Sequence, residues 1–294
     1  MTEKIQISEV LGNGQMLDGG SMFGNAPRAV WERWIACDEM GRIPLACRAM
    51  FVEIGSKKIL CETGIGAFFE PKLAERFGVQ DFEHHRLLEN LTSLGVHAED
   101  IDYVVLSHLH FDHAGGLLPT FKQIQSGDHG LVFPKAQFIV GEEAFERALH
   151  PHFRDKASFI PHLTDKLKDT GRLIIVSRGQ SSLSELPQID FFRSEGHTPG
   201  QLHTMVHGNN FNVVFAGDLI PGTPWVHLPI TMGYDRYPEK LIDEKRELYD
   251  KIAQRNWYVF FTHDNKIACS KIAKNEKGKY IPIEMLEHPK HFEI

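Results

Sequence analysis

The sequence predicts an α/β protein in which groups of strands are separated by helices. Three observations carry this prediction. Short apolar runs alternate with amphipathic stretches, the groups of strands form two halves of similar length, and 294 residues suffice to bury a substantial core. Two sandwiched sheets with outer helices fit this order, and a parallel doubly wound sheet fits it nearly as well. No GxGxxG or GxxxxGK[ST] motif follows a strand, so nucleotide-binding versions lose support.

In the first half, short apolar runs predict strands and a helical spacing of apolar residues predicts helices. A turn at Gly55-Ser56-Lys57 separates the first two strands, and Tyr-Val-Val-Leu marks a buried third one. The expected strands are 49–54, 58–61, 102–107 and 137–140. The expected helices are 82–94, with apolar residues at 87, 88, 91 and 94, and 142–149.

The second half is richer in strands. Gly208-Asn209-Asn210 reads as a hairpin turn between two of them. Pro238 suits the first turn of a helix whose apolar face includes Leu241 and Leu248, and whose charges form its solvated side. The expected strands are 172–176, 189–193, 202–207, 211–216 and 257–261.

Composition excludes several classes of protein. The 32 Lys and Arg against 39 Asp and Glu give a net charge of −7, which argues against nucleic acid as a partner. No apolar run approaches the roughly 18 residues of a membrane span. The N-terminus lacks the apolar core of a signal peptide, so we expect a cytoplasmic protein without membrane contact. Reduced, mostly buried thiols are expected at Cys37, Cys47, Cys61 and Cys269, because their spacing fits neither a zinc module nor a disulfide scaffold.

The strongest chemical signal is the run His108-Leu109-His110-Phe111-Asp112-His113, which directly follows an apolar strand. Four side chains that bind metals fall within six positions there. Side chains alternate along a strand, so His108 and His110 can point to one side, and a helical turn can bring Asp112 and His113 to a neighbouring point. The small residues that follow let the backbone pack close beneath bound ions. The run therefore predicts a metal site.

Three more candidate ligands lie at or just after the ends of apolar strands. His197 sits in the turn Gly196-His197-Thr198-Pro199-Gly200, Asp218 ends Phe215-Ala216-Gly217-Asp218, and His263 ends Phe260-Phe261-Thr262-His263. Each is weak alone, since Asp218 could cap a turn and His263 could lie on the surface. Their order after the first run makes them a set.

This set resembles the metallo-β-lactamase-fold hydrolase superfamily. The resemblance covers most of the chain and implies a single domain over residues 1–294, with an N-terminal extension at about 1–48. It also implies a four-layer αβ/βα sandwich, with two β-sheets flanked by helices and two metal ions at one edge. The first ion would be bound by His108, His110 and His197. The second would be bound by Asp112, His113 and His263, with Asp218 bridging the two.

The ligand set indicates which metals to expect. Imidazoles and carboxylates without thiolate suit two Zn²⁺ ions best, with Mn²⁺, Fe²⁺ or Co²⁺ as alternatives. Two such ions roughly 3.5–4 Å apart can share a hydroxide that attacks an electrophilic carbon or phosphorus. Asp112 is placed to orient this nucleophile and to act as the catalytic base.

Two positions depart from the superfamily's usual pattern. Glu62 stands where many relatives have Asp, in Glu62-Thr63-Gly64, and its extra methylene still permits contact with a metal-binding histidine. Pro221 stands where lactone-hydrolysing relatives often have a Tyr that polarises the substrate carbonyl. Tyr234 is a candidate replacement.

The stretches around GGSMFG and GDLIP resemble a lactonase-like branch that also contains organophosphate hydrolases. The N-terminal segment is expected to form an apolar arm over the site, a dimer contact that makes the protein a homodimer, or a segment packed on its own subunit. The candidate pocket residues are Met22, Phe23, Trp225, His227, Met232 and Tyr234.

The predicted function is hydrolysis of a small ester by a metal-bridging hydroxide, the substrate being a lactone, a carboxyl ester or an organophosphate. Two alternatives of the same fold stay open. A glyoxalase II-like thioesterase would use a C-terminal basic cluster, for which Lys266, Lys271 and Lys274 are candidates. A mononuclear-iron sulfur dioxygenase would keep the His108–His113 run, and metal analysis would separate it from the hydrolases.

Overall fold

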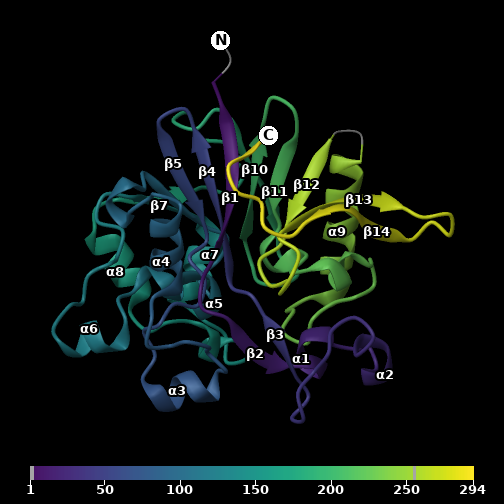
Figure 1. Cartoon of the computed structure of the whole chain (residues 1–294), viewed down its shortest axis with the longest axis horizontal. Coiled ribbons are helices and arrows are strands. Elements are labelled where there is room, and N and C mark those ends of the chain that lie inside the picture. The colour runs from purple at the N-terminus through teal and green to yellow at the C-terminus, as the bar shows by residue number, and fades with distance from the viewer. Residues whose placement is uncertain (1–2, 254–255) are drawn as a thin grey trace.

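The computed structural model describes residues 3–253 and 256–294, and two mixed sheets dominate it (Figure 1). The seven-stranded sheet has the order β15 (Phe292–Glu293), β1 (Ile5–Leu11), β4 (Arg48–Ile54), β5 (Lys57–Cys61), β6 (Tyr103–Leu106), β7 (Gln137–Gly141) and β8 (Leu173–Val176). The six-stranded sheet has the order β14 (Tyr280–Leu286), β13 (Cys269–Lys274), β12 (Trp257–Phe260), β11 (Asn212–Phe215), β10 (Gln201–His207) and β9 (Ile189–Ser194). A small third sheet pairs β2 (Gln15–Asp18) with β3 (Arg42–Leu45).

The pairing pattern rejects the doubly wound alternative. The strands β5 to β8 run parallel, but β1, β4 and β5 pair antiparallel in the same sheet. In the second sheet only β11 and β12 run parallel to each other. Two facing sheets of mixed direction, rather than one continuous parallel sheet, therefore form the framework.

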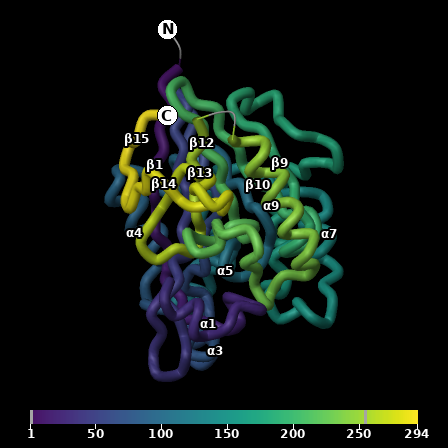
Figure 2. The backbone as a smooth tube through the Cα atoms, turned by 90° about the vertical axis from the view of Figure 1, so that its right-hand side faces the viewer, coloured from purple at the N-terminus to yellow at the C-terminus, as the bar shows by residue number. Residues whose placement is uncertain are grey.

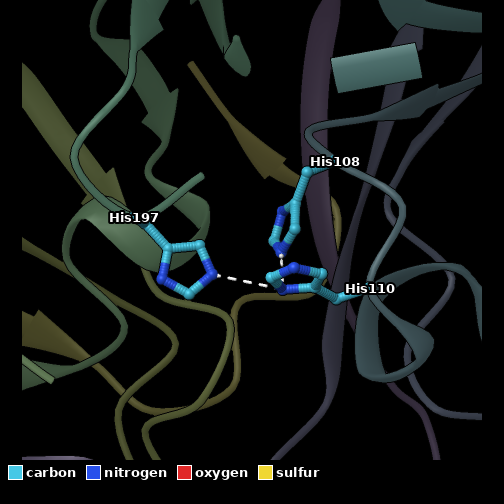
Figure 3. Close-up of side chains that lie close together, drawn as sticks. All are labelled: His108, His110 and His197. Carbon is cyan, nitrogen blue, oxygen red and sulfur yellow. Dashed lines mark hydrogen bonds between the residues drawn. The ribbon is translucent and has the colours of Figure 1, made fainter. Parts of the chain in front are cut away.

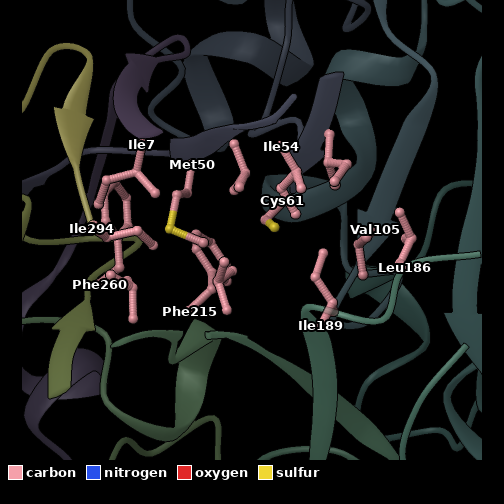
Figure 4. Close-up of a cluster of buried hydrophobic side chains, with 14 of the residues drawn as sticks. Ile7, Met50, Ile54, Cys61, Val105, Leu186, Ile189, Phe215, Phe260 and Ile294 are labelled. Carbon is pink, nitrogen blue, oxygen red and sulfur yellow. The ribbon is translucent and has the colours of Figure 1, made fainter. Parts of the chain in front are cut away.

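Alternating side chains explain why the sheets face each other. In β4, Met50 and Val52 point into the core between the sheets, whereas Phe51 points to the helices outside. The core between the sheets receives Val105 from one sheet and Phe215 and Phe260 from the other (Figure 4). Because both faces of the central strands β4, β6 and β12 are buried, these strands contain continuous apolar runs.

Helices cover the outer face of each sheet. The first sheet packs against α4 (Arg86–Ser93), α5 (Phe111–Ala114), α7 (Glu142–Leu149) and α8 (Leu163–Asp169). The second packs against α9 (Pro238–Ile252) and the N-terminal α1 (Gly19–Phe23) and α2 (Arg28–Trp31). The remaining helices are α3 (Pro71–Arg76) and α6 (Phe121–Gln125). The predicted four-layer αβ/βα sandwich is confirmed.

The N-terminal segment contributes to two different parts of the fold. Strand β1 lies beside β15 and β4 in the large sheet, and β1 and β15 run side by side in Figure 2. Residues 15–45 instead form the small sheet, α1 and α2 at the end of the molecule where the site lies. The extent of the domain stays a prediction.

Other expectations can be compared directly. The expected helix at 82–94 begins only at Arg86, because the His85 side chain accepts a hydrogen bond from the Leu88 amide and starts the helix there. All four cysteines are free, with Cys47, Cys61 and Cys269 buried. Within the described residues, every helix is too short or too polar to cross a bilayer.

Candidate metal centre and cavity

The first cluster consists of three imidazoles. Strand β6 ends at Leu106, and the loop after it carries His108 and His110, while His197 lies in the turn that follows β9. His108 Nε2 lies 3.0 Å from His110 Nδ1, which lies 3.3 Å from His197 Nε2 (Figure 3). All three side chains are buried. Three ring nitrogens therefore converge on one point, which is the arrangement of a tetrahedral metal site with one position left for another ligand.

The second cluster combines a carboxylate with two imidazoles. Helix α5 carries Asp112 and His113, and His263 lies in the loop after β12. Their ligand atoms all lie within 4.8 Å of one another. His263 Nε2 lies 3.5 Å from Asp112 Oδ2, and His113 Nε2 lies 3.8 Å from Asp112 Oδ1. Asp112 is 14% exposed at its side chain, whereas the two imidazoles are closed off from solvent.

Asp218 lies between the clusters and touches both. Its Oδ2 is 3.2 Å from His197 Nε2 and 3.3 Å from His113 Nε2. Its Oδ1 is 3.2 Å from His263 Nε2. The carboxylate reaches this place because Asp218 lies in the 3₁₀ turn Gly217–Leu219 shortly after β11, with Gly217 in the left-handed region at φ 47°. One side chain thus faces the converging atoms of both clusters.

The residues present fit two cations. Among the described residues, Asp218 Oδ1 and His113 Nε2 are buried without a hydrogen-bond partner, which is costly unless another group satisfies them. In the first cluster, three ring nitrogens face one another, and hydrogen bonds among them cannot satisfy every lone pair. Nitrogen and oxygen donors at this spacing suit zinc and other first-row divalent ions.

Burial and nearby charges shift the pKa values of the five imidazoles in different directions. Burial, followed by the neighbouring histidines, holds the pKa values of His108 and His110 well below the usual value for histidine. Burial also opposes charge on His113 and His263, but nearby carboxylates, chiefly Asp218, outweigh it and raise the pKa values of both. In the first cluster, His197 also has a raised pKa, because Asp218 and Asp235 outweigh its burial. His108 and His110 are therefore arranged as neutral imidazoles, whereas His113, His197 and His263 are imidazoles balanced by carboxylates.

Partners behind the ligands fix their orientation. Glu62 accepts a hydrogen bond from the Ser107 amide at 2.8 Å with Oε1, and its Oε2 lies 2.8 Å from His113 Nδ1. Glu62 adopts φ 70°, unusual for a residue other than glycine, which turns its longer side chain toward the site. His197 Nδ1 lies 2.9 Å from Asp235 Oδ1. The contact expected between Glu62 and a histidine is present.

A cavity of about 340 Å³ opens onto the clusters. Its wall includes the ligands His110, Asp112, His197, Asp218 and His263. The rest of the wall is formed by Leu17, Met22, Phe77, Phe111, Arg154, Asp155, Ala157, Ser158, Met232, Gly233 and Tyr234. Mostly apolar walls with a few converging polar groups are typical of a small-molecule site.

The structure brings some predicted pocket residues to this cavity and not others. Met22, Met232 and Tyr234 line it. Phe23 and Trp225 lie behind the wall, where their rings stack with centroids 4.5 Å apart and their faces bury each other. His227 lines a separate cavity beside Trp34, because its segment turns away from the clusters. Phe23, Trp225 and His227 were expected to line the pocket, but the structure places them outside the wall of this cavity.

Sequence reasoning missed several wall and support residues. The segment 154–158 approaches the clusters because Phe159 bridges to His110 as an isolated β-pair, with ring centroids 4.9 Å apart. Asp235 lies in a stretch without regular structure. A single acidic residue in such a stretch has no sequence signal of its own, whereas the ligands were marked by their spacing and by strand ends.

Comparison with known proteins agrees with this geometry. The family model for the metallo-beta-lactamase superfamily matches residues 42–263. An N-acyl homoserine lactonase from Bacillus thuringiensis is 24% identical over 245 residues, covering 76% of this chain and 82% of the relative. A solved structure of a probable metal-dependent hydrolase from Staphylococcus aureus has a TM-score of 0.83 and 26% identity, covering 97% of this chain and 99% of that one.

A dizinc quorum-quenching lactonase, AidC, solved with the product N-hexanoyl-L-homoserine, superposes with a TM-score of 0.73 at 20% identity, covering 98% of this chain and 97% of that one. At that identity the likeness concerns the fold. The family model, in contrast, spans the His108–His113 run and every other candidate ligand up to His263. This chain therefore belongs to the metallo-beta-lactamase superfamily, as its motifs predicted.

Proposed function

We propose that this protein is a dinuclear metal hydrolase that opens small esters, with lactones as the first substrate class. The observation that carries the proposal is the position of Asp218, within 3.3 Å of imidazoles from both clusters at the floor of an apolar cavity. The names of the Bacillus lactonases and of the AidC structure support lactones as the class to test first.

Seven residues would hold the metal ions. His108, His110 and His197 would bind the first, and Asp112, His113 and His263 the second, with Asp218 shared. Divalent cations bound there, Zn²⁺ before Mn²⁺, Fe²⁺ or Co²⁺, supply Lewis acidity and a nucleophile derived from water at neutral pH.

Asp112 combines two roles in this proposal. It belongs to the second cluster, and its carboxylate is also part of the cavity wall. Its partial exposure distinguishes it from the buried Asp218. Asp112 would therefore orient the attacking water and accept its proton, while the apolar wall around Met22 and Phe111 holds the rest of the substrate and excludes bulk water.

Tyr234 would take the place of the Tyr that is missing at Pro221. Its ring lies in the cavity wall, and burial, together with the negative charge of Asp112, raises the pKa of its phenol. A phenol that stays protonated at neutral pH can donate a hydrogen bond to the substrate's carbonyl oxygen. Tyr234→Phe is expected to lower kcat about 10- to 100-fold if this donor acts in the transition state.

The proposal is tested by the substrate range of protein reconstituted with zinc. We expect hydrolysis of N-acyl homoserine lactones, followed by phenyl acetate and an aryl phosphotriester, and loss of all turnover in excess chelator. Turnover of glutathione thioesters alone would instead indicate the thioesterase. One iron per chain with sulfur-dependent oxygen uptake would indicate the dioxygenase, and no chelator-sensitive turnover of any ester would overturn the proposal.

A further inference from the structure

Helix α9 carries two neighbouring, oppositely charged residues that are both buried. Glu244 is 8% exposed and Lys245 is fully buried. Consecutive residues on a helix point in different directions, and each of these bonds to the backbone of a different loop. Both loops lead directly to the candidate site.

Lys245 holds the loop that follows Asp218. Its Nζ donates hydrogen bonds of 2.7 Å to the carbonyl oxygens of Trp225 and Ile230. One turn further along the same face of α9, the Tyr249 hydroxyl donates to the carbonyl of Val226 at 2.7 Å. These bonds fix a stretch that has little regular structure of its own beyond one 3₁₀ turn at Thr223–Val226.

The held loop continues into the cavity wall. Met232 and Tyr234 follow directly and line the cavity. Asp235 then closes a turn by accepting a 2.6 Å hydrogen bond from the Met232 amide on Oδ2, while its Oδ1 contacts His197. A shift at residues 225–230 would therefore move the wall.

Glu244 holds the turn that carries His197. Its two carboxylate oxygens accept hydrogen bonds from the amides of Glu195 and Gly196, at 2.8 and 2.9 Å. The turn also lies tightly on α9, because a Cβ at Gly196 would stand 2.4 Å from Leu241. The residue just before His197 thus lies directly against the helix, where a side chain would not fit.

Burying an ammonium group is costly, and no carboxylate pairs with Lys245 directly in the part of the chain described. Burial lowers its pKa to about 7, an effect that the more distant Asp235 opposes. An apolar side chain of similar length would fill the same space without this cost. We therefore interpret Lys245 as a residue that positions the loop at 225–230, rather than one that stabilises the fold.

We propose that Glu244 and Lys245 are positioning residues with separate targets: Lys245 sets the shape of the substrate-facing wall through residues 225–234, and Glu244 sets the place of His197. The kinetic part of this proposal rests on the hydrolase function proposed above. The structural part does not, so it can be tested without any substrate.

Hydrogen–deuterium exchange tests the structural part. In Lys245→Met, amides at 226–235 should exchange about tenfold faster, while those of Glu195 and Gly196 keep their wild-type rates. In Glu244→Gln, the amides of Glu195 and Gly196 should exchange faster, while those at 226–235 keep their wild-type rates. The matched control is Lys251→Met, on the exposed side of the same helix, which should change neither region.

Kinetics on a substrate that the wild type turns over test the consequence. Lys245→Met should raise KM more than it lowers kcat, whereas Glu244→Gln should lower kcat and the amount of zinc retained. If wild type shows no turnover, the proposed function fails while the exchange result still stands. Equal changes in both regions from either variant, or no change, would overturn the positioning proposal.

A milder variant covers the case in which Lys245→Met does not fold. Tyr249→Phe removes only the hydroxyl that bonds to Val226 and keeps the ring in the core. It should give the same pattern as Lys245→Met at smaller amplitude, with faster exchange at 226–235 and a raised KM. Wild-type exchange and KM in Tyr249→Phe would contradict the proposal.

Discussion

The two ligand clusters share Asp218 but are supported in different ways. The imidazole of His197 in the first cluster depends on Asp235, which lies in an irregular loop. In the second cluster, His113 rests on Glu62 at the end of β5, and His263 Nδ1 lies 2.7 Å from the carbonyl oxygen of Ala46, just before β4. One cluster is tied to a loop, and the other to the ends of strands.

This difference teaches which parts of the molecule each cluster depends on. Hydrogen bonds to the neighbouring strands hold the strand ends in place, so the second cluster should be as rigid as the sheet. The loop that carries Asp235 is not part of a ladder. It is held by side chains of α9 and by single hydrogen bonds, such as that from the Gly233 amide to the Ser21 carbonyl. Changes to Asp235 should therefore disturb the first cluster, and changes to the sheet edge should disturb the second.

The largest expected effect on activity comes from Asp218. Because both clusters depend on this residue, changing it should disturb them together rather than separately. Asp218→Asn keeps the size of the side chain but removes the charge that faces three imidazoles. Turnover should fall well beyond the roughly 10- to 100-fold typical of residues behind the ligands. Bound zinc, measured by atomic emission, should fall at both positions, and an unchanged count of two would refute this role.

A paired substitution sharpens the comparison. Glu62→Gln should weaken the second position, and Asp235→Asn the first, each by about 10- to 100-fold in metal affinity. Titration of the metal-free protein with Co²⁺, followed by absorbance, should show one tight and one weakened site in each variant, with different spectra for the remaining tight site. Identical spectra in the two variants would show that the supports are not separate.

Arg48 connects the second cluster to the rest of the sheet. Its guanidinium donates to the carbonyls of Phe261 and Asp264, on either side of His263, and pairs with Glu9. Arg48→Met would leave Glu9 buried without this partner, so the free energy of unfolding should fall by about 3–5 kcal/mol in urea titrations. Arg246→Met, on the exposed side of α9, is the control and should change it little.

The free energy of unfolding should fall at acidic pH because of His203, which lies in β10 near His197. Burial lowers the pKa of His203 to about 3, so it stays neutral in the folded protein but takes up a proton below about pH 6.5 once unfolded. The stability that His203 contributes to the folded protein is lost as the pH falls from 6.5 towards 3. Relative to His203→Asn, wild type should lose about 2 kcal/mol between pH 7 and pH 5. A difference independent of pH would contradict the assignment.

The smallest effect concerns thiol access beside the second cluster. Cys47 is fully buried next to His263, and burial raises the pKa values of Cys47, Cys61 and Cys269. Iodoacetamide should therefore label only the partly exposed Cys37 in the folded protein, and all four cysteines in denaturant. Rapid labelling of Cys47 in the folded protein would contradict the rigidity inferred for this sheet edge.

The sequence predicted which candidate ligands come together, because each is marked by a local pattern. The run at 108–113, the turn at 196–200 and the residues after β11 and β12 all follow buried strands, so topology alone brings them to one edge. The apolar face of α9 was visible for the same reason, since it repeats with the helical period.

The supports could not be predicted in this way. Asp235, Lys245 and Glu244 act through contacts between segments distant in sequence, and the charges of α9 read as an ordinary solvated face. Phe23 and Trp225 looked like pocket residues, but large rings gain more by stacking on each other than by facing an open cavity. Strands β1, β13 and β14 were missed because polar or charged residues interrupt their apolar pattern, such as Glu9 in β1 and Lys271 in β13.

The position of Asp218 has a consequence for how the protein comes apart. The ligands at 108–113 belong to the first sheet, whereas His197, Asp218 and His263 belong to the second. Cations shared between them would act as reversible crosslinks across the sandwich, and their release would have to precede separation of the two layers. Saturating metal should then slow unfolding as well as shift its equilibrium, which makes the lifetime of the folded protein a function of metal supply.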